Sequence, residues 1–177
     1  ILACSPARAE PLLADWAVLV VAADEKASNG KLTEGFDNAR REIAAALLAK
    51  GARREHLRQL SVDPARDKTG APPLRVTPEA LDQALGEVAS RARGGCLLYF
   101  TSHGTPRGIA MGEGLYLPVQ MDQLADRHCK GRPTVVVVSA CFSGVFLPFL
   151  AEPERLVLSA ARRDRTSFGC GESDRMP

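Results

Sequence analysis

Short apolar runs alternate along the chain with stretches in which apolar residues recur every three or four positions. The runs at residues 16–23, 96–101 and 134–140 are rich in Val or Leu and too short for a typical helix, so they predict strands buried in a sheet. Residues 57–62 alternate apolar and polar side chains, which indicates a strand near the sheet edge. Residues 156–160 predict the last strand.

Helix signals separate these strands. Apolar positions at spacings of three and four predict a helix over residues 33–50, which Gly51 ends. Thr77-Pro78 supplies an N-cap and a proline at the first helical position of a second helix, which ends before Gly94. Two further helices are predicted at residues 119–129 and 143–150.

Strands that alternate with helices predict an α/β fold, a three-layer sandwich with a mostly parallel sheet and helices on both faces. A small hairpin is expected at residues 108–117, around Gly112-Glu113-Gly114. The length of 177 residues fits one domain, which we place at residues 15–177, after an N-terminal tail at residues 1–14.

Charge and composition exclude several classes of function. The net charge is +2, from 23 Lys and Arg against 21 Asp and Glu, and the basic residues are scattered, so nothing supports nucleic-acid binding. No apolar run reaches the about 20 residues that span a bilayer. Arginine outnumbers lysine 18 to 5, a bias that favours a bacterial source. No spacing of ligand residues resembles a metal site, so we expect no metal and no cofactor, and we expect His56 and His128 at the surface.

The five cysteines are Cys4, Cys96, Cys129, Cys141 and Cys170. They are too few for a disulfide scaffold, and no two have the C-x-x-C spacing of a zinc ribbon or a thioredoxin-type pair. Cys96 begins a predicted strand and Cys129 ends a predicted helix, where buried structural thiols are common. Export from the cytoplasm would allow a disulfide between two of the four cysteines other than Cys141.

The first residues resemble an export signal. Residues 1–4 are apolar up to Cys4, as at the end of a bacterial lipoprotein signal, and Ala7-Arg8-Ala9 resembles an A-x-A cleavage site. Both interpretations predict an exported protein, either periplasmic or anchored to a membrane by lipid on Cys4. The alternative is a chance resemblance and a cytoplasmic protein.

Two predicted strands end in residues with catalytic chemistry. One continues into Ser102-His103-Gly104 and the other into residues 139–144, which contain Cys141. Ligands bind beyond the carboxyl ends of strands in open α/β sheets, so neighbouring strands would bring the imidazole and the thiol to one edge. A thiolate beside an imidazole is the minimum for nucleophilic attack on an acyl carbon. Either residue alone is more often structural, which leaves a non-catalytic binding domain as an alternative.

The order of the two residues separates the possible enzyme classes. The α/β-hydrolases and the class I amidotransferases place their catalytic His after the nucleophile, whereas no His follows Cys141 here. His103 lies 38 residues upstream of Cys141, which is the order found in caspase-like cysteine peptidases.

At these residues the chain resembles the legumain-like cysteine peptidases, peptidase family C13, and in particular their bacterial members. The resemblance covers most of the chain, and its carriers are WAVLVVA from Trp16, YFTSHG ending at Gly104, the hairpin, VSACFSG ending at Gly144, and LSAARRDRTSFGC ending at Cys170.

The resemblance implies a caspase-like fold and cysteine endopeptidase activity on peptide or protein substrates. It implies His103 as general base and acid, Cys141 as nucleophile, and the backbone N–H groups of Gly104 and Cys141 as the oxyanion hole. Asp24 aligns loosely with a legumain Asn that orients the His. A transpeptidase or transamidase, which resolves the same acyl-enzyme with an amine, is the nearest alternative.

The chain departs from the family at two places. Legumains have an acidic residue directly after the catalytic Cys, whereas this chain has Phe142, so strict specificity for Asn is not expected. The family fold also continues beyond the position of Pro177, and the domain is therefore expected to be incomplete at its C-terminal end. Phe142, Ser167 and Phe168 are the expected substrate-contacting residues.

Overall fold

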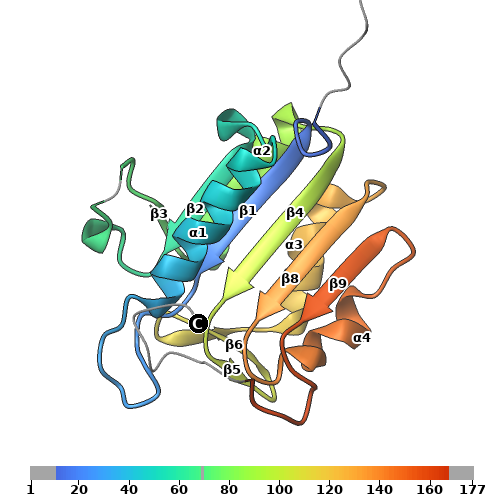
Figure 1. The fold of residues 1–177 in the computed structure, drawn as a ribbon. Coiled ribbons are helices and arrows are strands. Elements are labelled where there is room, and N and C mark those ends of the chain that lie inside the picture. The colour runs from blue at the N-terminus through green and yellow to red at the C-terminus, as the bar shows by residue number, and fades with distance from the viewer. Residues whose placement is uncertain (1–10, 69, 168–177) are drawn as a thin grey trace, which may run out of the picture.

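A six-stranded parallel sheet forms the centre of the computed structural model, which describes residues 11–68 and 70–167 (Figure 1). The expectations for Cys4, Phe168 and Cys170 fall outside the described residues. The strand order is β3-β2-β1-β4-β8-β9, and each neighbouring pair is parallel. The strands are β1 (Trp16–Ala22), β2 (Leu57–Ser61), β3 (Leu74–Arg75), β4 (Gly95–Thr101), β8 (Thr134–Ser139) and β9 (Arg155–Ser159).

Helices cover both faces of this sheet. Helix α1 (Gly35–Ala49) packs on one face, and α2 (Pro78–Arg91), α3 (Pro118–Cys129) and α4 (Leu147–Leu150) pack on the other. Successive side chains of β1 point to opposite faces, so Val18 and Val20 join the core under α1, while the side chains between and beside them join the larger core under α2 and α3. The predicted α/β sandwich is therefore confirmed.

The elements begin and end close to the predicted positions where the sequence has a strong signal. The Thr77 hydroxyl accepts a hydrogen bond from Ala80 N at 3.1 Å and caps α2, whose first residue is Pro78. The hairpin is present as β6 (Gly108–Met111) and β7 (Gly114–Tyr116), and β5 (Gly104–Thr105) adds a third antiparallel strand. The helix predicted at residues 143–150 is instead a 3₁₀ turn, η3 (Ser143–Phe146), followed by the four residues of α4. Two other 3₁₀ turns are η1 (Arg54–His56) and η2 (Pro64–Arg66).

The structure pairs two cysteines whose bonding the sequence left open, and it buries, fully or mostly, two histidines that were expected at the surface. Cys96, at the start of β4, forms a disulfide with Cys129, at the end of α3, and both residues are buried. The surface position expected for His56 is wrong, because only 6% of this residue is exposed and its Nδ1 lies 3.1 Å from Ala14 O. His128 is also mostly buried and contacts the carboxylate of Asp82 at 2.9 Å.

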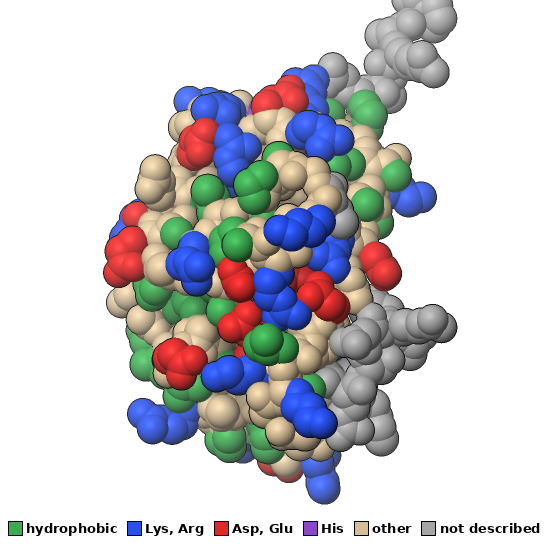
Figure 2. Space-filling model, turned by 90° about the vertical axis from the view of Figure 1, so that its left-hand side faces the viewer, with side chains coloured by type: hydrophobic (Ala, Val, Ile, Leu, Met, Phe, Trp, Pro, Cys, Tyr) green, Lys and Arg blue, Asp and Glu red, His purple; other side chains and the backbone are tan. Residues whose placement is uncertain are grey.

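Charged side chains of both signs are interspersed on the face that carries β3 and the turns around it (Figure 2). This agrees with the scattered basic residues of the sequence and shows no single-sign patch on that face. Among the described residues, no helix has the length and apolar character needed to cross a bilayer.

Candidate active site

Strands β4 and β8 bring His103 and Cys141 to the same edge of the sheet. The two strands are neighbours in parallel register, with Thr101 opposite Ser139, so each candidate residue lies two positions beyond a paired residue. The register continues one step past the sheet, because Ser102 N donates to Ser139 O at 3.3 Å. Parallel strands lie about 4.8 Å apart, so the chain segments that carry the imidazole and the thiol leave the sheet side by side.

Gly104 lies directly against the backbone of Cys141. A Cβ atom at Gly104 would be 1.7 Å from Cys141 O and 2.6 Å from Cys141 C, so this position has no space for any side chain. The close approach, rather than an unusual backbone angle, is what requires glycine here. It brings together the two residues whose N–H groups are the expected oxyanion hole.

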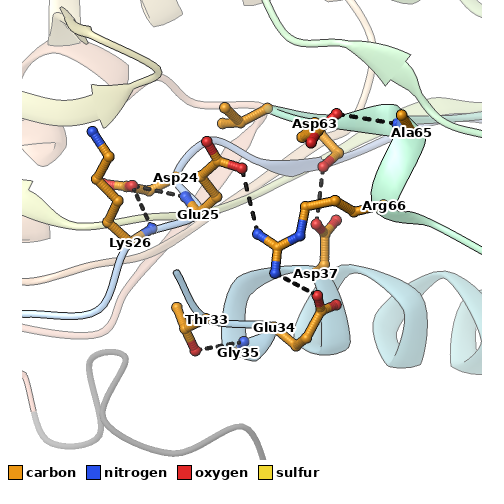
Figure 3. A network of polar contacts seen from close by, with 12 residues as sticks. Asp24, Glu25, Lys26, Thr33, Glu34, Gly35, Asp37, Asp63, Ala65 and Arg66 are labelled. Atoms are coloured by element: carbon orange, nitrogen blue, oxygen red, sulfur yellow. Dashed lines mark hydrogen bonds and ion pairs between the residues drawn. The ribbon is translucent and has the colours of Figure 1, made fainter. Parts of the chain in front are cut away.

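The imidazole of His103 has two supports, and neither is the side chain that the sequence suggested. Its Nε2 lies 2.8 Å from Lys26 O, and its ring meets the ring of Phe36 edge to face, with centroids 5.1 Å apart and an angle of 79° between planes. Asp24 supports this arrangement indirectly. Its Oδ1 accepts hydrogen bonds from Glu25 N at 2.7 Å and Lys26 N at 3.0 Å, which shapes the turn that presents the Lys26 carbonyl (Figure 3).

The sulfur of Cys141 is enclosed by the segment that follows β9. Ser167 N donates to Sγ at 3.3 Å, and Ser167 Oγ lies 3.6 Å from the same atom. Only 9% of Cys141 is exposed. Ser167 was expected to contact substrate, and the structure places it against the sulfur of Cys141.

Phe142, the residue after Cys141, has a left-handed backbone with φ 54° and ψ 12°. This conformation costs a non-glycine residue about 1–3 kcal/mol, and it is maintained only where surrounding contacts enforce it. Here Phe142 N donates to Arg165 O at 2.8 Å, and the next turn is fixed by Ser143, whose buried hydroxyl accepts from Ala161 N at 3.0 Å. The sharp turn therefore directs the chain from β8 into η3.

Comparison with protein families matches residues 79–176 to the model of the peptidase C13 family. This match covers more than half of the chain and includes His103, Cys141 and Ser167. The chain belongs to the peptidase C13 family. It is thus a legumain-like domain of the cysteine-peptidase class, as the sequence motifs predicted.

Among solved structures, this C13 domain resembles caspase-1 from Spodoptera frugiperda, with a TM-score of 0.60 and 12% identity. The similarity covers 87% of this chain and 62% of that structure, so the chain spans less than two thirds of the caspase chain. It confirms the caspase-like fold. No curated protein matches the chain.

The C13 domain also contains a buried polar cluster that sequence reasoning missed. Arg40 on α1 is 1% exposed, and its guanidinium donates to Asp37 at 2.8 Å and to Asp67. Ser61, at the end of β2, donates to the second carboxylate oxygen of Asp37 at 3.0 Å. A signal existed, because Asp37 and Arg40 stand three residues apart on the face of α1 that also carries the buried Ala44.

Arg66 forms a second ionic contact beside this cluster. Its guanidinium reaches Glu34 at 2.6 Å and Glu25 at 3.4 Å, and so joins the residue before α1 to the turn after β1 (Figure 3). All three side chains are partly exposed, with 26%, 39% and 23% of Arg66, Glu34 and Glu25 accessible.

The described residues contain one group of carboxylates close enough to hold a metal ion, namely Asp122, Asp126 and Glu152. Arg155 already donates to Asp122 at 2.8 Å and to Asp126 at 2.7 Å. These two carboxylates therefore bind a guanidinium and join α3 to β9.

Proposed function

We propose that this domain is a cysteine endopeptidase in which Cys141 is the nucleophile and His103 is the general base and acid. The observation that carries the proposal is the juxtaposition of the two segments beyond β4 and β8, with Gly104 against the backbone of Cys141. Membership of the C13 family supports peptides or proteins as the substrates.

The contacts of His103 assign its proton before the reaction. A carbonyl oxygen only accepts hydrogen bonds, so the Nε2 that faces Lys26 O carries the proton. Nδ1 is then the nitrogen with a lone pair, and it takes the proton of the thiol. The Lys26 carbonyl continues to accept from Nε2 after this transfer and so stabilises the imidazolium, much as a carboxylate does in other hydrolases.

The reaction then runs in two halves. The Cys141 thiolate attacks the peptide carbonyl carbon, and the N–H groups of Gly104 and Cys141 stabilise the oxyanion that develops. The carbon–nitrogen bond breaks, the leaving amine takes the proton from the imidazolium, and a thioester remains on Cys141. His103 then takes a proton from water, the hydroxide attacks the thioester, and the acid is released as the thiol regains its proton.

A peptide probe with an acyloxymethyl ketone group tests this proposal on the full-length protein. Mass spectrometry is expected to find the label on Cys141, to find none in Cys141→Ala, and to find slower labelling in His103→Ala. Cys96→Ala and Cys129→Ala are the controls and are expected to label normally. Equal labelling of the Cys141→Ala protein would refute the assignment.

The acyl-enzyme on Cys141 has one alternative fate. A bound amine can attack the thioester in place of water, and the product is then a new peptide bond instead of a free acid. Adding a peptide with a free amino terminus to the cleavage reaction distinguishes the outcomes. Ligated product shows transpeptidation, and its absence at high amine concentration leaves hydrolysis.

We also propose that the domain functions outside the cytoplasm. The Cys96–Cys129 disulfide supports this, because structural disulfides persist in oxidising compartments and are rare in the cytosol. Lipid on Cys4 is the expected anchor. Fractionation of the native protein into a soluble cytoplasmic pool, with Cys96 and Cys129 both open to alkylation, would contradict the proposal.

A further inference from the structure

We propose that Arg66 is a positioning residue for His103, which it orients through Glu25 and Glu34 without contacting the imidazole. The inference rests on the proposed function, since it concerns the general base of that reaction. It follows from how the two supports of the imidazole are joined to one another.

The first support is a carbonyl on a short loop. Lys26 O holds Nε2 at 2.8 Å, and a single hydrogen bond of this kind leaves the ring free to tilt about its own axis. The loop is tethered beside this carbonyl, because the preceding residue, Glu25, is ion-paired with Arg66 at 3.4 Å.

The second support is the ring of Phe36, which limits that tilt. Phe36 is the second residue of α1 and is 5% exposed, and its edge-to-face contact is a geometry that aromatic pairs prefer. Glu34 lies two residues earlier and is ion-paired with Arg66 at 2.6 Å. The position of Phe36 therefore depends on how the start of α1 is held.

Arg66 thus bridges the side chains next to both supports, in addition to the backbone hydrogen bond from Thr33 N to Glu25 O at 2.9 Å and the Arg41–Glu34 ion pair at 3.4 Å. Figure 3 shows the Arg66 side chain between Glu25 on the β1 side and Glu34 at the start of α1. Arg66 is itself well anchored, because its neighbour Asp67 accepts from the buried Arg40. The planar guanidinium of Arg66 donates to the two carboxylates from two different nitrogens, whereas a Lys side chain has only one nitrogen to place between them.

The partial exposure of the three side chains makes the inference testable. Ion pairs of this exposure contribute little to stability, so removing Arg66 is expected to leave the fold intact. A displacement of about 1 Å at a catalytic group, in contrast, can lower the rate by about a hundredfold. The expected signature is therefore a change in the rate of catalysis without a change in stability.

The test compares Arg66→Gln with Arg58→Gln. Arg58, near the start of β2, is 25% exposed and pairs with the 38% exposed Glu87 at 2.7 Å. Its exposure and ion-pair distance match those of the Arg66–Glu34 pair, which lies beyond the other end of β2. With a fluorogenic peptide that the wild type cleaves, Arg66→Gln is expected to lower kcat about tenfold or more with KM within about twofold. Arg58→Gln is expected to keep both, and Arg66→Lys to recover only part of kcat.

Two further measurements keep the result decisive. Glu34→Gln and the double variant with Arg66→Gln are expected to lower kcat by about the same factor as Arg66→Gln alone, since the residues act as one unit. The Nε2 proton of His103, protected by Lys26 O, is expected to give an imidazole N–H signal in NMR spectra that Arg66→Gln loses and Arg58→Gln keeps.

The outcomes separate this inference from the proposed function. Cleavage that persists in Cys141→Ala refutes the proposed function, and the NMR comparison still decides whether Arg66 orients the ring. Unchanged kcat together with an unchanged N–H signal in Arg66→Gln overturns the inference while leaving Cys141 and His103 as the catalytic pair.

Discussion

Gly104 shows how one missing side chain makes the site possible. Gly104→Ala would place a Cβ 1.7 Å from Cys141 O, so the two segments must separate. We expect a loss of stability of about 1–3 kcal/mol and a loss of probe labelling at Cys141, because both proposed oxyanion donors move. Gly114→Ala is the matched control, since its Cβ would meet nothing nearer than Met111 O at 3.8 Å. Normal labelling of Gly104→Ala would show that the backbone contact is not needed.

Phe142 leads to a prediction about specificity. An apolar ring in place of a carboxylate removes a hydrogen-bond acceptor for a substrate amide, and losing such a partner weakens discrimination for polar side chains. We expect strict cleavage after Asn to be relaxed or absent in a peptide library. Cleavage confined to Asn would show that Phe142 does not determine the pocket and that acidic residues elsewhere, such as Asp164, replace the missing carboxylate.

For individual residues, the sequence was enough to predict the candidate catalytic side chains but not the contacts made by backbone atoms. His103 and Cys141 could be found because each follows a buried strand directly. The carbonyl of Lys26 could not, because every residue has a carbonyl and only the fold brings this one to the imidazole. Asp24 was the nearest residue with a recognisable side chain, and it shapes the turn beside the true contact.

The disulfide joins two elements that are distant in sequence, the start of β4 and the end of α3. Closing a loop across a separation of 33 residues stabilises a fold by about 3–4 kcal/mol in the chain-entropy model. The double variant Cys96→Ala/Cys129→Ala is therefore expected to unfold at lower denaturant concentration, while Cys141 labelling at 25 °C is retained. Equal denaturation midpoints with and without reductant would contradict this.

Helices α2 and α3 are joined at the surface by Asp82, whose carboxylate contacts His128 and Arg127. The hydrogen bond from His128, reinforced by the charge of Arg127, lowers the pKa of Asp82. A lowered pKa in the folded state gives stability that is present above the ordinary value of about 4 and lost as pH falls through the folded value. Thermal melts of wild type and Asp82→Asn are expected to differ at pH 5 and to converge near pH 2. A difference that grows at pH 2 would contradict the assignment.

Element prediction succeeded where periodicity or capping extends over several residues. Strand β1 and helix α2 begin within one residue of their predicted starts. Strands β3 and β5 have two residues each, which is too few for a pattern, and they form only because a neighbouring strand offers partners. The division of residues 143–150 into η3 and α4 follows from the left-handed Phe142, which no local signal announces.

Over the whole molecule, the least replaceable charge is Arg40, which ties α1 to the turn after β2. Removing one partner of a buried ion pair leaves the other unpaired and costs about 3–5 kcal/mol. Arg40→Ala is expected to lower the free energy of unfolding by this amount, measured by urea denaturation. Arg127 also pairs with a carboxylate that has a second partner, Asp82, but the Arg127 side chain is 61% exposed. Arg127→Ala is therefore expected to lower the free energy of unfolding by less than about 1 kcal/mol. Equal costs would show that Arg40 is not buried as described.

A disulfide and the thiol of Cys141 lie at opposite ends of the central sheet. Cys96 lies opposite Thr134 at the beginning of the β4–β8 ladder, whereas Cys141 lies two residues beyond Ser139, the last residue of β8. The stretch of chain from Thr134 to Cys141, which is β8 and the two residues after it, is on the order of 20 Å long. Thiol–disulfide exchange requires the attacking sulfur to reach the bond it cleaves, so Cys141 has no route to Cys96 or Cys129 within one folded molecule. A small protein can therefore contain a thiol and a disulfide without exchange between them, because the length of one strand separates the two.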